Sequence, residues 1–378
     1  MKFNWNYPTT VWVGENRINE LSEACKNLNL TKPLFVTDKH LINLPFIKNI
    51  VSKNLKKFDN FTIFSNFTGN PTGENVDEGV WEFKKNNCDG VIAIGGGSAL
   101  DVGKAIAFMS GQNRPIWDFE DIDDYWKRAN EDKISPIIAI PTTAGTGSEV
   151  TSFATIWDEE HGRKFSLAHD NLYPEIAVVD PVLMLGKPHD LTLATGLDAL
   201  SHAVESIWNV NANPVSARHA VAAATSIIAN LPKLLNNLDN LELRHKIAEA
   251  SLNAGLAFSN TKTAIAHNIS YPITLGWGVQ HGIACSFTLP TILRSLIGLG
   301  GFRETALKQI FGNNLETGAE NLKQFLASVE VGHRFSDQGV SETDCKKIID
   351  DAFIGERGKN FIGSKESFWE AAKQMGSL

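Results

Sequence analysis

Long apolar runs are missing from this 378-residue chain, and no stretch approaches the roughly 20 residues that a membrane-spanning helix needs. The N-terminal MKFNWNYPTT lacks the apolar core of a secretory signal peptide. Clustered basic residues are also missing. The net charge is −8 and the charges are spread along the chain, which argues against a nucleic-acid-binding surface. We therefore expect a cytoplasmic protein that has neither a membrane nor a nucleic acid as its partner.

Cysteine is scarce as well. The four cysteines, Cys25, Cys88, Cys285 and Cys345, are far apart and match no zinc or redox spacing. We expect reduced thiols, as is usual in the cytoplasm. The remaining composition, 43% hydrophobic and 21% charged, is ordinary for a globular protein, and the length is sufficient for two domains.

The first half of the chain alternates short apolar, β-branched runs with amphipathic stretches. Such alternation predicts a parallel sheet with helices on both faces, and ligands that bind at the carboxyl ends of its strands. The expected strands lie at 9–14, 33–38, 61–66, 90–96, 136–143 and 176–181. The expected helices between them lie at 17–28, 46–58 and 75–86.

After residue 180 the strand signals largely vanish and helical patterns dominate. The clearest helical stretches are 194–208, 216–235, 243–258 and 320–330. We therefore expect an α/β domain over residues 1–180 and an all-helical domain over residues 181–378.

A glycine-rich segment follows the fourth expected strand and precedes a helix. Gly95, Gly96 and Gly97 would let the backbone approach a ligand, and the helix N-terminus would offer N–H groups to a pyrophosphate. Ser98 is suited to be the helix cap and a further donor. The segment differs from the G-x-G-x-x-G fingerprint, since Leu100 stands where the third glycine would be. A turn that needs glycine only for steric reasons is the alternative.

Two further strand ends carry polar side chains. The segment IPTTAGTGSEV offers the hydroxyls of Thr142, Thr143, Thr146 and Ser148, which suit contacts to the cofactor's ribose or phosphate. Asp38 ends an earlier strand and can accept hydrogen bonds from both adenosine ribose hydroxyls, which favours NAD(H) over NADP(H). For the hydroxyls the alternative is capping within a tight turn, and for Asp38 it is a helix cap.

Four candidate metal ligands stand in two helix-like segments of the second half. Asp198 and His202 are four residues apart, which places both on one face of a helix. His267 and His281 lie in the segment that follows. One carboxylate and three imidazoles suit Fe²⁺ or Zn²⁺ better than Mg²⁺ or Ca²⁺. An ordinary surface pair or a core histidine is the alternative for any one of them.

Together these pieces resemble the iron-containing (group III) alcohol dehydrogenase family. The segments that carry the resemblance are VTD at 36–38, GGGSALDVGKAIA at 95–107, PTTAGTGSEV at 141–150, AVVDP at 177–181, TGLDALSHAVES at 195–206 and HG at 281–282. The resemblance implies an α/β dinucleotide-binding domain and an all-helical domain with the active site in the cleft between them. Dehydroquinate synthase-like lyases share this architecture.

The resemblance also implies roles for individual residues. The family's four metal ligands match Asp198, His202, His267 and His281, and its cofactor-binding residues match those proposed above. Asp101 and Lys104 fall on positions that the family fills in the same way, and Lys164 matches a basic residue near the cofactor. A homodimer or larger homo-oligomer is the family's common state.

One position departs from the family. Many members have a further histidine four residues after the third ligand, where it is thought to assist proton transfer. This chain has Tyr271 there, one helical turn from His267 and therefore on the same face. Tyr271 is either a catalytic proton donor or an apolar wall residue.

The implied reaction is hydride transfer between NAD(H) and a small aldehyde or primary alcohol, with the metal as Lewis acid. HNISYPITLGWGVQHG and WDFEDIDDYW resemble the reductases of phosphonoacetaldehyde, which suggests an anionic substrate. The basic residues that would then meet the anion are Lys127, Arg128, Lys164 or Arg357. The alternatives are a general aliphatic alcohol dehydrogenase, a lactaldehyde- or glycerol-type dehydrogenase, a dehydroquinate synthase-like lyase and, outside enzymes, a nucleotide sensor.

Overall fold

The computed structural model describes residues 2–54, 61–120, 129–130, 133–161 and 163–378. The chain divides into two compact units. The α/β unit comprises Tyr7–Thr143 and Ser148–Leu185, and the helical unit comprises the N-terminal stretch up to Asn6, Ala144–Gly147 and Gly186–Leu378. A domain boundary between residues 180 and 181 stays a prediction. Among the described residues, no helix is long and apolar enough to cross a membrane.

A parallel sheet of six strands forms the centre of the α/β unit, as far as the structure describes it, with the order β1-β8-β5-β4-β2-β3. Its strands are β1 (Thr10–Val13), β2 (Pro33–Val36), β3 (Thr62–Phe64), β4 (Gly90–Gly95), β5 (Ile137–Pro141) and β8 (Ile176–Val179). The predicted parallel sheet is therefore confirmed. β1 lies at one edge of this sheet, and the homo-oligomer that the family resemblance implies stays a prediction.

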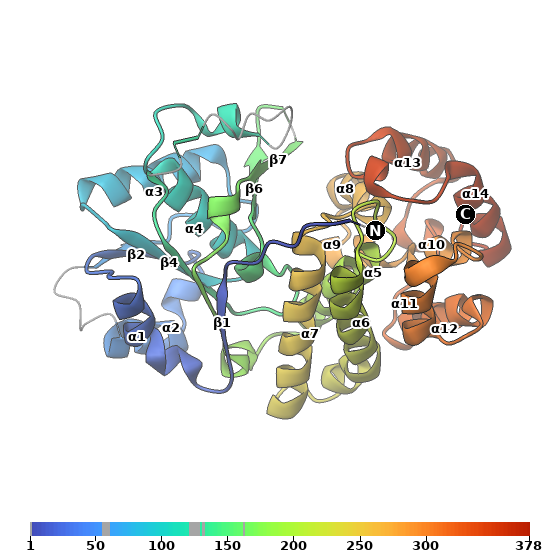
Figure 1. Cartoon of the computed structure of the whole chain (residues 1–378), viewed down its shortest axis with the longest axis horizontal. Helices are drawn as coiled ribbons and strands as arrows, with labels where there is room; N and C mark the ends of the chain where they lie inside the picture. The colour runs from blue at the N-terminus through green and yellow to red at the C-terminus, as the bar shows by residue number, and fades with distance from the viewer. Residues whose placement is uncertain (1, 55–60, 121–128, 131–132, 162) are drawn as a thin grey trace. The chain divides into compact units, whose positions relative to one another are not determined.

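Helices cover both faces of this sheet, because its central strands are apolar on both sides. In β4, Val91 and Ala93 pack into one core, while Ile92 and Ile94 pack into the other. The first core is completed by α3 (Gly73–Lys85) and α4 (Gly97–Met109), and the second by α1 (Leu21–Asn27) and α2 (Pro45–Asn54). Figure 1 shows the two pairs of helices on opposite sides of the strands.

A second, two-stranded sheet is the part of the α/β unit that the sequence analysis missed. β6 (Phe153–Asp158) and β7 (Arg163–Ala168) pair antiparallel. Every second residue of β6 is buried, with Ala154 and Ile156 in the same core as α3 and α4. The strands are amphipathic and rich in charge, so their apolar signal is weaker than that of the fully buried parallel strands.

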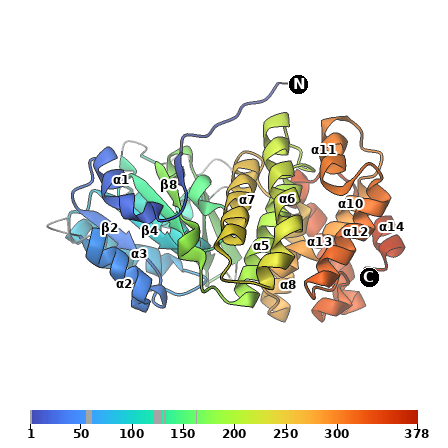
Figure 2. The same ribbon diagram turned by 90° about the horizontal axis from the view of Figure 1, so that it is seen from below.

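The helical unit forms around one apolar core. Its helices are α5 (His189–Glu205), α6 (Pro214–Leu235), α7 (Leu241–Ser259), α8 (Ile265–Trp277), α9 (His281–Ser286), α10 (Leu289–Ser295), α11 (Gly301–Phe311), α12 (Leu315–Ser328), α13 (Glu342–Ile354) and α14 (Lys365–Met375). α5, α6 and α7 pack side by side, as both views show (Figures 1 and 2). The mostly helical second half that the sequence predicted is confirmed.

Candidate functional site

The glycine-rich loop joins β4 to α4 in the α/β unit. Gly95 has a φ of 151°, which residues with a Cβ rarely adopt. A Cβ built on it would also lie 2.6 Å from the Cβ of Ala99, so both the backbone conformation and the available space require glycine. Gly96 is the N-cap of α4, and no side chain caps the helix. The prediction that Ser98 caps α4 is wrong, because the helix already begins at Gly97 and Ser98 lies in its first turn. The uncapped N–H groups at this helix start suit a pyrophosphate.

Asp38 lies beside this loop, two residues after the end of β2. Its Oδ1 accepts hydrogen bonds from the N–H groups of His40 (2.8 Å) and Leu41 (2.9 Å), so Asp38 does cap the next turn. Its Oδ2 would lie 3.9 Å from a Cβ on Gly95. One carboxylate oxygen therefore holds the turn while the other lies next to the glycine loop. Hydrogen bonding from Asp38 to a ribose stays a proposal.

The end of β5 reaches the same place. The N–H of Thr142 donates to the carbonyl oxygen of Gly95 at 2.8 Å, and Thr143 Oγ1 lies 3.5 Å from the position of a Cβ on Gly96. The structure thus brings Asp38, the glycine loop, Thr142 and Thr143 together at the carboxyl ends of adjacent parallel strands, where ligands bind in such sheets.

The other three proposed cofactor contacts have different surroundings. Thr146 belongs to the short segment of the helical unit. The Ser148 hydroxyl donates to Asp101 Oδ1 at 2.7 Å. Lys164 lies on β7, with Nζ 5.4 Å from the ring centroid of Trp157. The hydrogen bond of Ser148 therefore attaches its loop to α4. For Thr146, Ser148 and Lys164, a contact to the cofactor stays a proposal.

Lys104 and its neighbours form a buried charged network behind the glycine loop. Lys104 is fully buried and donates to the carbonyl oxygens of Thr151 (2.7 Å) and Phe153 (2.9 Å). Burial lowers the pKa of Lys104 to about 8, against the opposing effect of Asp101. Burial also raises the pKa of Glu149 to about 7. Lys104 therefore secures α4 to the start of β6.

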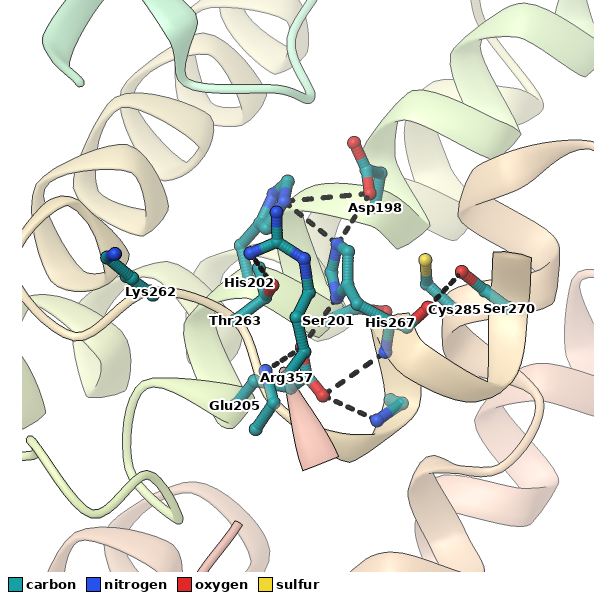
Figure 3. A network of polar contacts seen from close by, with 12 residues as sticks. Asp198, Ser201, His202, Glu205, Lys262, Thr263, His267, Ser270, Cys285 and Arg357 are labelled. Atoms are coloured by element: carbon teal, nitrogen blue, oxygen red, sulfur yellow. Dashed lines mark hydrogen bonds and ion pairs between the residues drawn. The ribbon is translucent and has the colours of Figure 1, made fainter. Parts of the chain in front are cut away.

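The four candidate metal ligands meet in the helical unit. Asp198 and His202 are on α5, His267 is on α8, and His281 is the first residue of α9. Asp198 Oδ1 lies 3.8, 3.6 and 3.9 Å from the Nε2 atoms of His202, His267 and His281. Figure 3 shows Asp198, His202 and His267 pointing toward one another.

Local backbone features bring His281 to this cluster. α8 ends at Trp277, and its C-cap Gly278 has a φ of 69°, which lets the chain reverse. Gly282 then allows α9 to touch α5, since a Cβ on it would lie 1.8 Å from the carbonyl oxygen of Ala194. His267 and His281 therefore stand on two helices, and the sequence did not indicate the break between them.

Hydrogen bonds fix which nitrogen of two histidines faces the cluster. His267 Nδ1 lies 2.5 Å from Glu205 Oε2, and His202 Nδ1 lies 3.4 Å from the carbonyl oxygen of Gly145. Each Nδ1 therefore carries a hydrogen and donates it, which leaves a lone pair on each Nε2. These two Nε2 atoms are 3.0 Å apart. Two lone pairs at that distance repel unless a proton or a cation lies between them.

Asp198 points to the same requirement. Its Oδ1 is buried and has no hydrogen-bond partner, although a buried charge normally has one. Bonds of about 2.0–2.2 Å at tetrahedral angles place donor atoms about 3.3–3.6 Å apart, close to the separations of 3.0–3.9 Å observed here. The residues therefore fit a divalent ion such as Fe²⁺ or Zn²⁺.

The electrostatics of the cluster agree. Burial alone would raise the pKa of Asp198, but His202, His267 and His281 outweigh it and the pKa is lowered. Burial lowers the pKa of His202 to about 4, so this imidazole is neutral at pH 7. Burial alone would lower the pKa of His267, but Cys285, Glu205 and Asp198 outweigh this effect, and the net pKa is well above 6.5. These acidic groups favour a positive charge at the cluster, which a metal ion would supply in place of a proton.

Two residues of the cluster, Glu205 and Cys285, were not predicted from the sequence. Glu205 is fully buried and accepts from His267 Nδ1 and from the N–H groups of Ala264 (3.1 Å) and Ala266 (2.6 Å). Cys285, on α9, lies 3.5 Å from His281 Nε2. Helical spacing could have indicated both residues, because Glu205 follows His202 by three residues and Cys285 follows His281 by four.

Tyr271 stands beside the last ligand, where the sequence placed it near the cluster. Its ring is parallel to that of His281 within 2°, with 5.9 Å between the centroids. The guanidinium carbon of Arg357 lies 5.9 Å from the centroid of Tyr271. Proton donation by Tyr271 stays a proposal.

Comparison with known proteins agrees with this chemistry. Residues 8–181 match the profile described as iron-containing alcohol dehydrogenase, and residues 192–364 match the C-terminal region of the same family. The chain is 32% identical over 360 residues to the NAD-dependent methanol dehydrogenase of Bacillus methanolicus, covering 93% of each protein. It is 32% identical over 356 residues to the 1,3-propanediol dehydrogenase of Citrobacter freundii, covering 90% of each.

Solved structures give the same result. The sulfoacetaldehyde reductase of Bifidobacterium kashiwanohense, solved in complex with NAD⁺, has a TM-score of 0.91 and 29% identity, with all of both chains covered. A 1,3-propanediol oxidoreductase has a TM-score of 0.89 and 29% identity, with 99% of this chain and all of that chain covered. With both halves matched in sequence and fold, the chain belongs to the iron-containing alcohol dehydrogenase family of NAD-dependent oxidoreductases.

Proposed function

We propose that this oxidoreductase uses NADH to reduce a small aldehyde that carries an anionic group, such as a sulfonate or a phosphonate. The observation that carries the proposal is that the ring of Tyr271 neighbours both Arg357 and His281. This arrangement places a guanidinium one aromatic ring away from a candidate metal ligand. An uncharged aldehyde has no anionic group for this guanidinium to bind.

Arg357 is held in place by its surroundings. Its Nη1 donates to Thr263 Oγ1 at 3.1 Å, as Figure 3 shows, and Thr263 lies two residues before the start of α8. A guanidinium is always charged and its planar donors match the oxygens of sulfonates and phosphonates. Of the other basic candidates, Lys164 lies in the α/β unit, and Lys127 and Arg128 lie outside the described residues.

A comparison supports an anionic substrate of this size. A protein named as a sulfoacetaldehyde reductase matches this chain over its full length. Sulfoacetaldehyde and phosphonoacetaldehyde are both two-carbon aldehydes with an anionic head group, so one arginine could serve either. Phosphonoacetaldehyde is the substrate that the sequence predicted, and it stays a proposal.

The residues of the cluster have distinct roles in this reaction. When bound by Asp198, His202, His267 and His281, a divalent ion supplies a Lewis acid that polarises the aldehyde carbonyl. Glu205 and the Gly145 carbonyl hold two of the histidines with Nε2 turned toward the cluster. Arg357 orients the anionic end of the substrate. Tyr271, next to His281, is the candidate to deliver the proton that the product alcohol requires.

The cofactor residues supply the other half of the reaction. The loop at 95–97 and the N-terminus of α4 would hold the pyrophosphate of NADH, with Asp38 at the adenosine ribose. NADH supplies the hydride, and the protein supplies its binding and orientation. The reverse reaction oxidises the corresponding primary alcohol with NAD⁺.

The test is NADH oxidation by Fe²⁺-loaded protein with sulfoacetaldehyde, phosphonoacetaldehyde and butyraldehyde at equal concentrations. We expect a strong preference for an anionic aldehyde. Arg357→Met should raise KM for that aldehyde by about 10- to 100-fold, the value of a hydrogen bond to a charged group, and leave butyraldehyde unaffected. Arg294→Met, on α10, is the matched control. Equal use of butyraldehyde by the wild type would refute the anionic substrate and favour a general alcohol dehydrogenase.

A further inference from the structure

We propose that Cys285 is an alternative to His202 as the fourth donor of the metal cluster, and that its sulfur binds Zn²⁺ or Co²⁺ more strongly than it binds Fe²⁺. The proposal concerns which ion the site retains. It does not depend on the identity of the substrate.

The position of Cys285 makes it a donor. It lies on α9 one helical turn after His281 and therefore on the same face. The residue is fully buried, and its Sγ lies 3.5 Å from His281 Nε2. Sγ, one carboxylate oxygen of Asp198 and one ring nitrogen each of His267 and His281 all lie within 4.8 Å of one another. Figure 3 shows the Cys285 sulfur close to His267, with Asp198 nearby.

An independent observation indicates that a cation belongs among these groups. The Asp198 side chain is only 7% exposed, and its Oδ1 has no hydrogen-bond partner. Three histidine nitrogens lie 3.6–3.9 Å from this oxygen, too far for a hydrogen bond. A buried carboxylate oxygen surrounded in this way is satisfied by a metal ion.

Asp198, His267 and His281 can be completed to a tetrahedral set by either of two residues. His202 provides a nitrogen, 3.0 Å from that of His267. Cys285 provides a sulfur, 3.5 Å from that of His281. Nitrogen and oxygen donors suit Fe²⁺, whereas a thiolate is a soft donor that favours Zn²⁺. The thiol loses its proton to solvent as the bond to sulfur forms.

Cobalt substitution tests the proposal directly, since a thiolate bound to Co²⁺ gives a strong charge-transfer absorption in the near ultraviolet that nitrogen and oxygen donors do not give. We expect this absorption in the Co²⁺-loaded wild type, its loss in Cys285→Ser, and its retention in Cys345→Ser, where the buried thiol of α13 is changed instead. The visible Co²⁺ bands should persist in Cys285→Ser, because Asp198 and the histidines remain.

Zinc affinity, measured by competition with a chelator, should fall at least about 10-fold in Cys285→Ser while Fe²⁺ affinity stays unchanged. X-ray absorption of the zinc-loaded wild type, which needs no variant, should show one sulfur at about 2.3 Å. A wild type with no near-ultraviolet absorption and only nitrogen and oxygen around zinc would overturn the proposal. So would a Cys285→Ser protein whose cobalt spectrum matches the wild type.

Discussion

At the scale of single residues, Glu205 explains how the cluster keeps its donors aimed. It accepts hydrogen bonds from His267 Nδ1 and from the backbone N–H groups of Ala264, Ala266 and His267 itself. Burial would raise the pKa of Glu205, but His267 and these N–H groups outweigh it, so the pKa is lowered and the side chain stays ionised. One carboxylate thus fixes both the start of α8 and the ring of His267.

We expect Glu205→Gln to weaken metal binding by about 10- to 100-fold, because such partners hold ligand rings in position. The amide removes the negative charge and one of the two acceptor oxygens. Chelator competition with Fe²⁺ or Zn²⁺ measures the affinity, and circular dichroism checks that the helices remain. Glu249→Gln on α7, where the exposed carboxylate pairs with the partly exposed His245, is the control. An affinity equal to the wild type would show that Glu205 serves folding alone.

The sequence indicates the candidate ligands more readily than the residues that hold them in place. Asp198 and His202 follow from their spacing on one helix, and His267 and His281 gained support from each other and from the family resemblance. Glu205 could not be found in this way, because a glutamate near the end of a helix usually faces solvent. Its burial depends on the loop before α8, which the chain supplies some sixty residues later.

At the scale of elements, contacts between helices decide where the donors meet. α9 touches α5 so closely that Gly282 admits no side chain, and this approach brings His281 to Asp198. The sequence shows a glycine at position 282 but does not predict that another helix packs against it. Periodicity indicates which face of a helix is apolar and not how near the next helix lies. The β6–β7 hairpin was missed for a related reason, since its partial burial arises from packing against α4.

We expect Gly282→Ala to move α9 away from α5 and to reduce both stability and metal retention. A Cβ would lie 1.8 Å from the Ala194 carbonyl oxygen, and overpacking of this kind costs about 1–3 kcal/mol. Thermal unfolding and metal content after dialysis measure the two effects. Gly276→Ala on α8 is the control, since a Cβ there meets nothing within 4 Å. If Gly282→Ala retains its metal as well as Gly276→Ala does, the close approach is not needed for the site.

At the scale of the whole molecule, the chain assigns different chemistry to its two units. The α/β unit carries the glycines and polar strand ends that we propose to bind the dinucleotide, and the helical unit gathers acidic and imidazole side chains from three helices. The order of strands and helices was predictable, because buried parallel strands are strongly apolar and amphipathic helices are periodic. The contacts between helices and strands could not be predicted from the sequence, because they depend on three-dimensional packing.

The measurement that tests the account most directly is metal content per chain together with NADH-dependent aldehyde reduction, compared between the wild type and His267→Ala. His245→Ala, which changes a partly exposed histidine of α7 outside the cluster, controls for the substitution. The account predicts about one Fe²⁺ or Zn²⁺ per wild-type and His245→Ala chain, and loss of both metal and activity in His267→Ala. A His267→Ala protein that keeps its metal and full activity would contradict the account.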